Sequence, residues 1–439
     1  MAATRRRARA RVEGVVQGVG FRPYVYRLAR ELELAGWVLN DAHGVLLEVE
    51  GGASAVEQFL ARLAPEAPPL AIVERVRVSG AVVSGAGTFE ILSSDRGRGA
   101  DAPVTADSAT CFDCLRELFD PADRRHRYPF INCTNCGPRF TIVCAVPYDR
   151  PFTTMAAFEM CPACRAEYED PGDRRFHAQP NACPQCGPSV RLLGPTSASP
   201  GLDPVRAAAD ALIDGRIVAV KGIGGFHLAC RADDEDAVGR LRSRKHREDK
   251  PFALMAPGID AAGALVDLSG PARELLLSPA RPIVLAPRRS TPRGAAVARS
   301  VAPGAPELGV MLPYSPLHHL LLRDTETTLV MTSGNVSDEP ICFRDGDAIE
   351  RLGSIADLLL VHDRPIETRT DDSVLRVTSR RTTVLRRSRG YVPSALPLPG
   401  EGTPRPLLAT SMRRPENMPL LSPPRQSRSD EDDEVLKFE

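Results

Sequence analysis

Four Cys-x-x-Cys pairs constrain the fold of this chain more strongly than any other feature of its sequence. They are Cys111/Cys114, Cys133/Cys136, Cys161/Cys164 and Cys183/Cys186. The number of residues between the first and second pairs is the same as that between the third and fourth pairs. Two cysteines at this spacing can bind one zinc ion from a single turn, and a second pair about twenty residues further on completes a tetrahedral four-sulfur shell. The sequence therefore predicts duplicated four-cysteine zinc ribbons over residues 105–192, holding two Zn²⁺ ions.

The spacing leaves two ligand arrangements open. The simpler sets are consecutive, Cys111/Cys114/Cys133/Cys136 and Cys161/Cys164/Cys183/Cys186, whereas a cross-braced arrangement would join the first pair to the third or fourth. In either arrangement four sulfurs fill the zinc shell, so both ions are predicted to be structural rather than catalytic. A disulfide framework is disfavoured because the N-terminus lacks a secretory signal core and the chain is too long for a stapled mini-domain. The other cysteines, Cys144, Cys230 and Cys342, are expected to be ordinary buried thiols.

The composition indicates a globular protein of several domains. The 439 residues carry 56 basic and 56 acidic side chains, so the chain lacks the positive excess of a protein that coats duplex nucleic acid. Hydrophobic residues make up 43% of the chain, yet no apolar run approaches the roughly eighteen residues that a membrane span requires. We therefore expect a cytoplasmic protein without a membrane partner, and nucleic acid is not the expected ligand.

The first predicted domain covers residues 7–95 and has the strand and helix order of a ferredoxin-like fold. Strand patterns lie near 8–16, 36–39, 45–49, 72–78 and 89–92, and helix patterns lie at 23–34 and 53–63. Between the first strand and the first helix, Gly14, Gly18 and Gly20 allow backbone N–H groups to surround an anion at the helix N-terminus. Arg22 follows, and its guanidinium can bind a phosphate through two hydrogen bonds.

The string from Gly14 to Arg22 resembles the loop of the acylphosphatase family, Gly-x-Val-Gln-Gly-Val-Gly-Phe-Arg. The resemblance implies that Arg22 binds the phosphoryl group and that Asn40, on the following hairpin, orients the attacking water. It also implies that Gln17, Gly18, Val19 and Gly20 form the anion-binding loop. Positioning and charge stabilisation carry such a reaction without a covalent nucleophile. The alternative is a glycine loop with a solvated arginine and a turn asparagine.

Residues 200–392 alternate helices and strands in the pattern of a twisted α/β sheet. Helices are predicted at 205–214, 234–242 and 317–322, strands at 217–220, 309–312 and 329–331, and a flexible loop at 221–227. Lys245, Arg247 and Lys250 concentrate positive charge, while Ser333 and Asn335 follow a strand end, a common ligand position in such sheets. Taken singly, a solvated basic segment and a plain turn are the commoner explanations of these residues.

Together these strings resemble the YrdC/Sua5 family, whose members bind ATP and make carbamoyl-type adenylates. The resemblance implies that Lys245, Arg247 and Lys250 hold ATP phosphates and that Ser333 and Asn335 line the nucleotide pocket. Lys221-Gly222-Ile223-Gly224 stands where that family has Pro-Thr-Glu-Thr-like residues, which argues against threonine as a substrate. His227 follows this loop, and both a place at the pocket and a structural role are open for it.

The three modules in this order resemble the hydrogenase-maturation carbamoyltransferase family, HypF, over residues 8 to about 395. The strings at 130–140, 174–180, 332–335 and 370–374 add to the likeness. The resemblance implies that carbamoyl phosphate is hydrolysed to carbamate at the acylphosphatase site, and that ATP, with Mg²⁺, then converts carbamate to carbamoyl adenylate. A Kae1-like domain would transfer the carbamoyl group to the C-terminal cysteine of a partner, HypE.

The resemblance ends shortly after Leu407-Leu408-Ala409-Thr410. Residues 393–439 are expected to be the truncated start of the Kae1-like domain, followed by a disordered tail rich in Pro, Ser, Arg and acidic residues. Transfer to the partner would then need a separate polypeptide. Three other functions stay open: a threonylcarbamoyl-adenylate synthase for tRNA modification, a zinc-ribbon adaptor for nucleic acid or protein, and an inactive fragment.

Overall fold

The computed structural model describes residues 5–95, 102–194, 203–289, 297–336, 339–378 and 381–396. Residues Met1–Ser394 form one compact unit, and Ala395–Glu439 form a second. Apart from Ala395 and Leu396, the second unit lies outside the described residues, and so does nearly all of the predicted tail.

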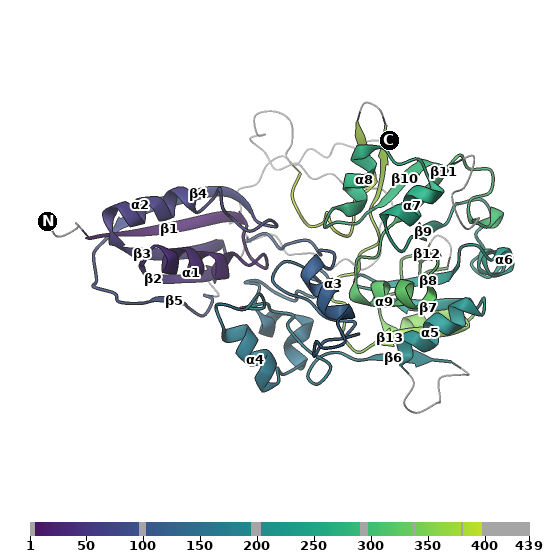
Figure 1. Ribbon diagram of the computed structural model, residues 1–439, viewed down its shortest axis with the longest axis horizontal. Helices are drawn as coiled ribbons and strands as arrows, with labels where there is room; N and C mark the ends of the chain where they lie inside the picture. Colours follow the sequence, from purple (N-terminus) through teal and green to yellow (C-terminus); the bar gives the residue numbers. More distant parts are fainter. Residues whose placement is uncertain are drawn as a thin grey trace, which may run out of the picture. The chain divides into compact units, whose positions relative to one another are not determined.

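The N-terminal domain is a five-stranded sheet with two helices (Figure 1). Its elements are β1 (Arg5–Val15), α1 (Phe21–Glu31), β2 (Ala35–Asp41), β3 (Gly44–Gly52), α2 (Ala53–Arg62), β4 (Ile72–Ala81) and β5 (Phe89–Ile91). The strand order β4-β1-β3-β2-β5, with β1 antiparallel to both β3 and β4, confirms the predicted ferredoxin-like fold. Val12, Val25, Leu47 and Phe59 from the sheet and both helices belong to one hydrophobic core.

The central segment contains two short helices that each begin at a cysteine pair. α3 (Phe112–Phe119) has Cys111 as its N-cap, and α4 (Pro162–Glu169) has Cys161. Two 3-10 helices, η1 (Arg150–Phe152) and η2 (Thr154–Ala157), lie between them in the chain. The first cysteine pair of each half thus has the same local structure, which confirms the predicted duplication.

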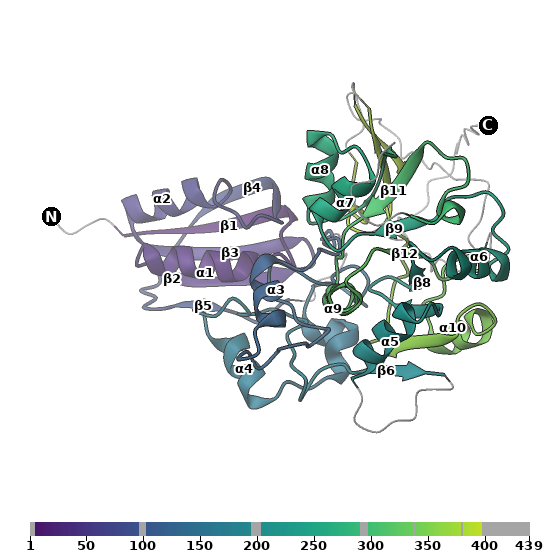
Figure 2. The same ribbon diagram turned by 45° about the vertical axis from the view of Figure 1, so that its right-hand side comes forward.

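The third domain is built on a ten-stranded sheet with the order β15-β14-β10-β11-β9-β12-β8-β7-β13-β6 (Figure 1, Figure 2). Its strands are β6 (Val190–Leu193), β7 (Val218–Lys221), β8 (Phe226–Arg231), β9 (Ala253–Met255), β10 (Ile283–Pro287), β11 (Glu307–Met311), β12 (Leu329–Ser333), β13 (Leu358–His362), β14 (Val374–Val377) and β15 (Thr382–Arg386). Its helices are α5 (Pro204–Ile213), α6 (Glu235–Arg244), α7 (Ile259–Leu265), α8 (Gly270–Leu277), α9 (Pro316–Thr325) and α10 (Asp345–Leu352), with the 3-10 helix η3 (Arg299–Val301). These elements confirm the predicted mixed α/β sheet.

Residues 221–227, predicted as a flexible loop, instead turn a hairpin. β7 ends at Lys221, β8 begins at Phe226, and Val220 lies opposite His227. A Cβ atom added at Gly224 would collide with Thr370. The loop is therefore shorter than predicted and covers residues 222–225, where the glycines permit close backbone packing.

Two hydrophobic cores cover opposite faces of the large sheet. Helices α6, α7, α8 and α10 contribute to one core, and α5 and α9 contribute to the other. The second core also includes Leu118, Tyr128, Phe130 and Ile131 of the central segment. Strand β6, which directly follows the last cysteine pair, joins the sheet beside β13. The cysteine-rich segment therefore shares a hydrophobic core and a sheet with the third domain and is not an independently packed domain.

None of the helices in the described ranges is long and apolar enough to span a bilayer.

Candidate functional site

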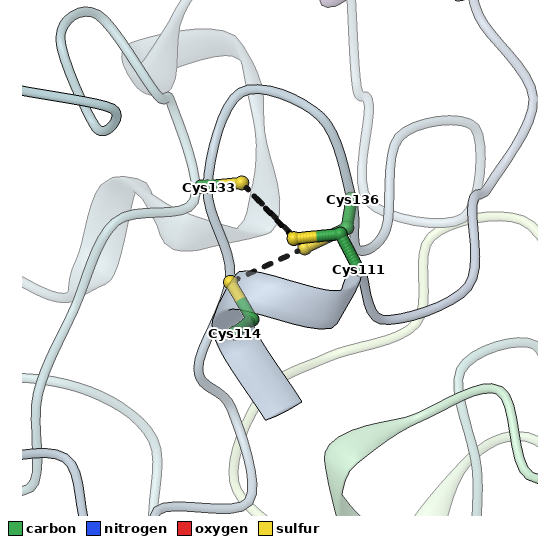
Figure 3. Close-up of side chains that lie close together, drawn as sticks. All are labelled: Cys111, Cys114, Cys133 and Cys136. Atoms are coloured by element: carbon green, nitrogen blue, oxygen red, sulfur yellow. Dashed lines mark hydrogen bonds between the residues drawn. The ribbon is translucent and has the colours of Figure 1, made fainter. Parts of the chain in front are cut away.

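The eight cysteines of the four pairs gather into the two consecutive ligand sets. In the first set, Cys111 Sγ lies 3.6 Å from Cys133 Sγ, and Cys114 Sγ lies 3.5 Å from Cys136 Sγ (Figure 3). In the second set the matching distances are 3.8 Å for Cys161 and Cys183, and 3.6 Å for Cys164 and Cys186. Sulfurs about 2.3 Å from a tetrahedral zinc lie about 3.8 Å apart. Both sets fit Zn²⁺, the distances exclude the cross-braced arrangement, and all these cysteines are free of disulfides.

Each zinc site receives a guanidinium from the other repeat. Arg174 of the second repeat donates from Nη1 to Cys114 Sγ at 3.1 Å and from Nε to Glu117 Oε1 at 3.0 Å. Arg124 of the first repeat donates from Nη2 to Cys164 Sγ at 3.2 Å and to Glu167 Oε2 at 2.6 Å. Hydrogen bonds of this kind orient a metal's ligands and reduce their negative charge. The two sites are therefore linked reciprocally.

Acidic side chains on α3 and α4 hold these arginines in place. Burial alone would raise the pKa of Glu167, but hydrogen bonds from Arg125 and Arg124 outweigh burial and lower it to about 2. The pKa of Glu117 is lowered by the same balance, with Arg174 and Arg175 as the donors. Both carboxylates stay ionised at neutral pH, so each fixes a pair of guanidinium groups beside a thiolate.

The glycine loop of the first domain leads directly into the N-terminus of α1. Gly18 and Gly20 have φ angles of 73° and 76°, in the left-handed region that glycine favours. Gly20 is the N-cap of α1, which is why the helix begins at Phe21 and not at the predicted Pro23. The unpaired N–H groups of a first helical turn attract an anion. The loop therefore has the backbone geometry that the sequence predicted for an anion cradle.

Arg22 and Asn40 lie together beside this loop, and they are 7% and 1% exposed. With its amide oxygen turned toward Arg22, Asn40 accepts hydrogen bonds of 3.2 Å from both Nε and Nη2. Arg22 also donates from Nη2 to Asp149 Oδ1 at 2.8 Å and from Nη1 to Ser94 Oγ at 3.3 Å. The guanidinium of Arg22 and the amide of Asn40 thus line one cavity, and the carboxylate of Asp149 pairs with the guanidinium.

The central segment supplies a second wall of this cavity. The backbone N–H of Tyr148 donates to Gln17 Oε1 at 2.9 Å, and Arg139 Nε donates to the carbonyl oxygen of Gly18 at 2.6 Å. The lining residues from the central segment are Thr134, Arg139, Tyr148, His177, Ala178 and Gln179. The sequence did not predict this wall, although the strings at 130–140 and 174–180, which contain most of its residues, contributed to the resemblance to the HypF family.

In the third domain, Lys245, Ser333 and Asn335 meet at the end of β12. Lys245 Nζ donates to the carbonyl oxygen of Ser333 at 2.8 Å and to Asn335 Oδ1 at 2.6 Å, and Ser333 Oγ donates to Asn335 Oδ1 at 2.8 Å. Lys245 is fully buried, and burial, followed by the charge of Arg247, lowers its pKa to about 7. Arg247 donates to the backbone carbonyls of Lys250 and Pro251. The ammonium group of Lys245 thus holds the turn that carries Ser333 and Asn335.

A buried polar network surrounds His227. His227 Nε2 lies 2.8 Å from Asp372 Oδ2, and Asp372 Oδ1 accepts a hydrogen bond from Arg389 Nε at 2.9 Å. The Arg389 guanidinium lies 3.4 Å from the centre of the Tyr314 ring. His227 is thus paired inside the fold and fixes the motif at 370–374.

Two of the three remaining cysteines match the prediction. Cys230 and Cys342 are buried, as expected for small apolar side chains. Cys144 is exposed, and its sulfur lies 3.7 Å from Glu367 Oε2. The prediction for Cys144 was wrong because residue type alone does not report burial in an irregular segment.

Three family models match the chain. The acylphosphatase model covers residues 8–91, the HypF finger model covers 110–143 and 160–193, and the model described as telomere recombination, for the Sua5, YciO and YrdC proteins, covers 210–388. The chain is 50% identical over 416 residues to carbamoyltransferase HypF2 of Cupriavidus necator. It is 53% identical over 391 residues to carbamoyltransferase HypF of Rhodobacter capsulatus. The chain belongs to the HypF carbamoyltransferase family.

Solved structures of HypF proteins share this architecture. A crystal structure of full-length HypF in a phosphate- and nucleotide-bound form has a TM-score of 0.86 at 45% identity, covering 90% of this chain and 51% of that one. The crystal structure of T.kodakarensis HypF has a TM-score of 0.81 at 44% identity, covering 88% and 50%. The chain spans about half the length of the curated relatives it matches, 51% of both the C. necator and the R. capsulatus proteins. The first domain alone is 42% identical to the acylphosphatase of Thermotoga maritima over 90% of that protein.

Membership of the HypF family confirms the predicted kinds of domain and identifies the two four-cysteine units as HypF fingers. The roles of Arg22 and Asn40, and of Lys245, Ser333 and Asn335, stay predictions that rest on the geometry described above.

Proposed function

We propose that this HypF-family chain hydrolyses carbamoyl phosphate at the Arg22–Asn40 site and activates the resulting carbamate with ATP in its third domain. The observation that carries the proposal is the placement of Arg22 and Asn40 beside a left-handed glycine loop, inside a cavity that the fingers close. The names of its relatives support the reaction class, and one solved relative holds phosphate and nucleotide.

In the first step, the loop N–H groups and Arg22 bind the phosphoryl oxygens, and Asn40 orients a water molecule for in-line attack on phosphorus. The bond between phosphorus and the carbamoyl oxygen breaks, and carbamate and phosphate form. In the structure, Arg22 Nη2 donates a hydrogen bond to Asp149 Oδ1 at 2.8 Å. A phosphoryl group can replace this carboxylate because both are oxyanions that accept from the guanidinium fork.

In the second step, a carbamate oxygen attacks the α-phosphorus of ATP, so that pyrophosphate leaves and carbamoyl adenylate forms. Ser333 and Asn335 line the nucleotide pocket and Lys245 holds their turn. Arg247 and Lys250 balance the phosphate charge, and a Mg²⁺ ion bound with ATP would supply further positive charge there. Carbamate decomposes quickly in water, which favours having both sites on one chain. In the complete family protein, a Kae1-like part would pass the carbamoyl group to the C-terminal cysteine of a HypE-type partner.

The test is exchange of labelled pyrophosphate into ATP by the zinc-loaded chain. Exchange should depend on carbamoyl phosphate, and Arg22→Ala should abolish it. The same variant should keep exchange when carbamate is supplied directly from ammonium bicarbonate, because the second site is intact. Arg30→Ala, an exposed arginine on the same helix, is the matched control. Exchange that needs threonine plus bicarbonate would instead indicate a threonylcarbamoyl-adenylate synthase.

A further inference from the structure

The cavity over the glycine loop has more polar groups than phosphate binding requires. On the first-domain side, the loop and Arg22 suffice for a phosphoryl group. The opposite side, called the finger wall below, is formed by residues of the central segment, among them His177 of the second finger and Tyr148, which lies between the two fingers. A substrate whose phosphoryl group lies on the loop must direct its acyl group toward this finger wall. The chemistry of the wall therefore determines which acyl group fits.

Most hydrogen-bonding groups of the finger wall are already engaged. Gln179 Oε1 accepts from the backbone N–H of Arg150 and from the Tyr168 hydroxyl, and Gln179 Nε2 donates to the carbonyl oxygen of His177. Arg139 donates to the backbone carbonyls of Gly18, Cys136 and Pro138. These side chains hold the wall together, so they contribute shape and little selectivity.

Tyr148 and His177 differ from these neighbours. The Tyr148 hydroxyl is buried, and within the described ranges it has no hydrogen-bond partner. His177 is half-buried, and its ring nitrogens make no hydrogen bond to any residue that the structure describes. A buried hydroxyl such as that of Tyr148 is rarely left unpaired without a reason. Tyr148 and His177, whose polar side-chain atoms have unused hydrogen-bonding capacity, thus both line one cavity.

The backbone and the neighbouring rings fix the position of His177. Its φ angle is 54°, its N–H donates to the carbonyl oxygen of Tyr168 at 3.0 Å, and its ring lies 4.6 Å from the Phe176 ring and 5.0 Å from the Tyr168 ring. Burial, followed by the charge of Arg22, lowers the pKa of His177 to about 4. The imidazole is therefore neutral at physiological pH and offers one N–H donor and one nitrogen acceptor.

We propose that His177 and Tyr148 bind the carbamoyl group at the first site and that His177 determines specificity for it. The carbamoyl group differs from a simple acyl group by an NH₂, which donates hydrogen bonds. The neutral His177 nitrogen accepts from this NH₂, and the Tyr148 hydroxyl donates to the carbonyl oxygen. This assignment rests on the proposed hydrolysis of carbamoyl phosphate and adds the residues that select it.

The experiment compares carbamoyl phosphate with acetyl phosphate, which has a methyl group in place of the NH₂. Phosphate release is measured with the zinc-loaded chain for wild type, His177→Phe and His177→Asn. Phe keeps the ring packing but removes the acceptor, and Asn tolerates positive φ and keeps an acceptor. His177→Phe should lower kcat/KM for carbamoyl phosphate about ten- to a hundredfold, as expected for a lost hydrogen bond in a closed site. Acetyl phosphate turnover should stay within about threefold, and His177→Asn should recover part of the loss.

Tyr148→Phe should lower turnover of both substrates, because both have the carbonyl oxygen. His126→Gln, an exposed histidine in the first repeat, is the matched control and should change neither. Equal loss on both substrates in His177→Phe, or no loss on either, would overturn the assignment while leaving the proposed hydrolysis intact. Failure of the wild-type chain to hydrolyse either acyl phosphate would instead remove the proposed function itself.

Discussion

Replacing Arg174 by Gln should weaken zinc binding at the cysteine set of the other repeat. Arg174 donates to Cys114 Sγ at 3.1 Å, and its side chain is 24% exposed. A hydrogen bond to a charged group contributes about 1.5–3 kcal/mol, and partial exposure places this one near about 2 kcal/mol. That free energy corresponds to about a thirtyfold loss of affinity. Removal of groups that orient metal ligands usually costs about 10- to 100-fold in affinity, which agrees.

The assay is zinc release to a competing chelator, followed by alkylation of the freed cysteines and peptide mass spectrometry. In Arg174→Gln, the set Cys111/Cys114/Cys133/Cys136 should become reactive first, although the substitution is in the second repeat. Arg124→Gln should give the reverse order. The control is Arg116→Gln on α3, whose ion pair with Asp113 is 3.6 Å long and exposed, and whose effect should stay below about twofold. Unchanged release from the first set, or release from the second set first, would refute the reciprocal linkage.

Three further predictions concern the third domain, the cavity of the first site and the hydrophobic core. Lys245→Met should lower carbamoyl-phosphate-dependent ATP–pyrophosphate exchange at least about tenfold, with phosphate release unchanged, because the turn at Ser333 and Asn335 loses its central donor. Folding lowers the pKa of His177 from 6.5 to about 4, so its contribution to stability is full above pH 6.5 and is lost as the pH falls toward 4. In urea unfolding, the free energy of unfolding of the wild-type chain should fall between pH 7 and pH 5, and in His177→Asn this fall should be smaller by roughly 1–2 kcal/mol. Phe226→Ala, in the buried core of the large sheet, should cost about 3–5 kcal/mol in guanidinium unfolding, whereas the 89% exposed Val82 should tolerate Ala within about 0.5 kcal/mol.

The features predicted correctly from the sequence depend on short segments. Cysteine spacing, glycine placement before a helix and alternating apolar residues report local geometry, so the cysteine sets, the glycine loop before α1 and the strands of the first domain were predictable. The wall of the first site was not, because Arg22 and Asp149 are 127 residues apart and Arg139 and Gly18 are 121 apart. The burial of Lys245 was equally hidden from the sequence. Its side chain is ionisable and yet fully buried, because three backbone and side-chain oxygens surround its terminal nitrogen.

The duplication of the fingers explains how one segment serves two different neighbours. Arg127 and His177 occupy the same place after the Arg-Arg pair of each repeat, and both have a left-handed backbone, with φ angles of 56° and 54°. Arg127 pairs with Asp203 and Asp324 of the third domain, whereas His177 lines the cavity of the first. A repeated turn thus projects one side chain toward each domain, an arginine that forms ion pairs in the first repeat and a histidine that lines a cavity in the second. Since each finger also donates an arginine to the other's thiolates, loss of either zinc ion should disturb both neighbours.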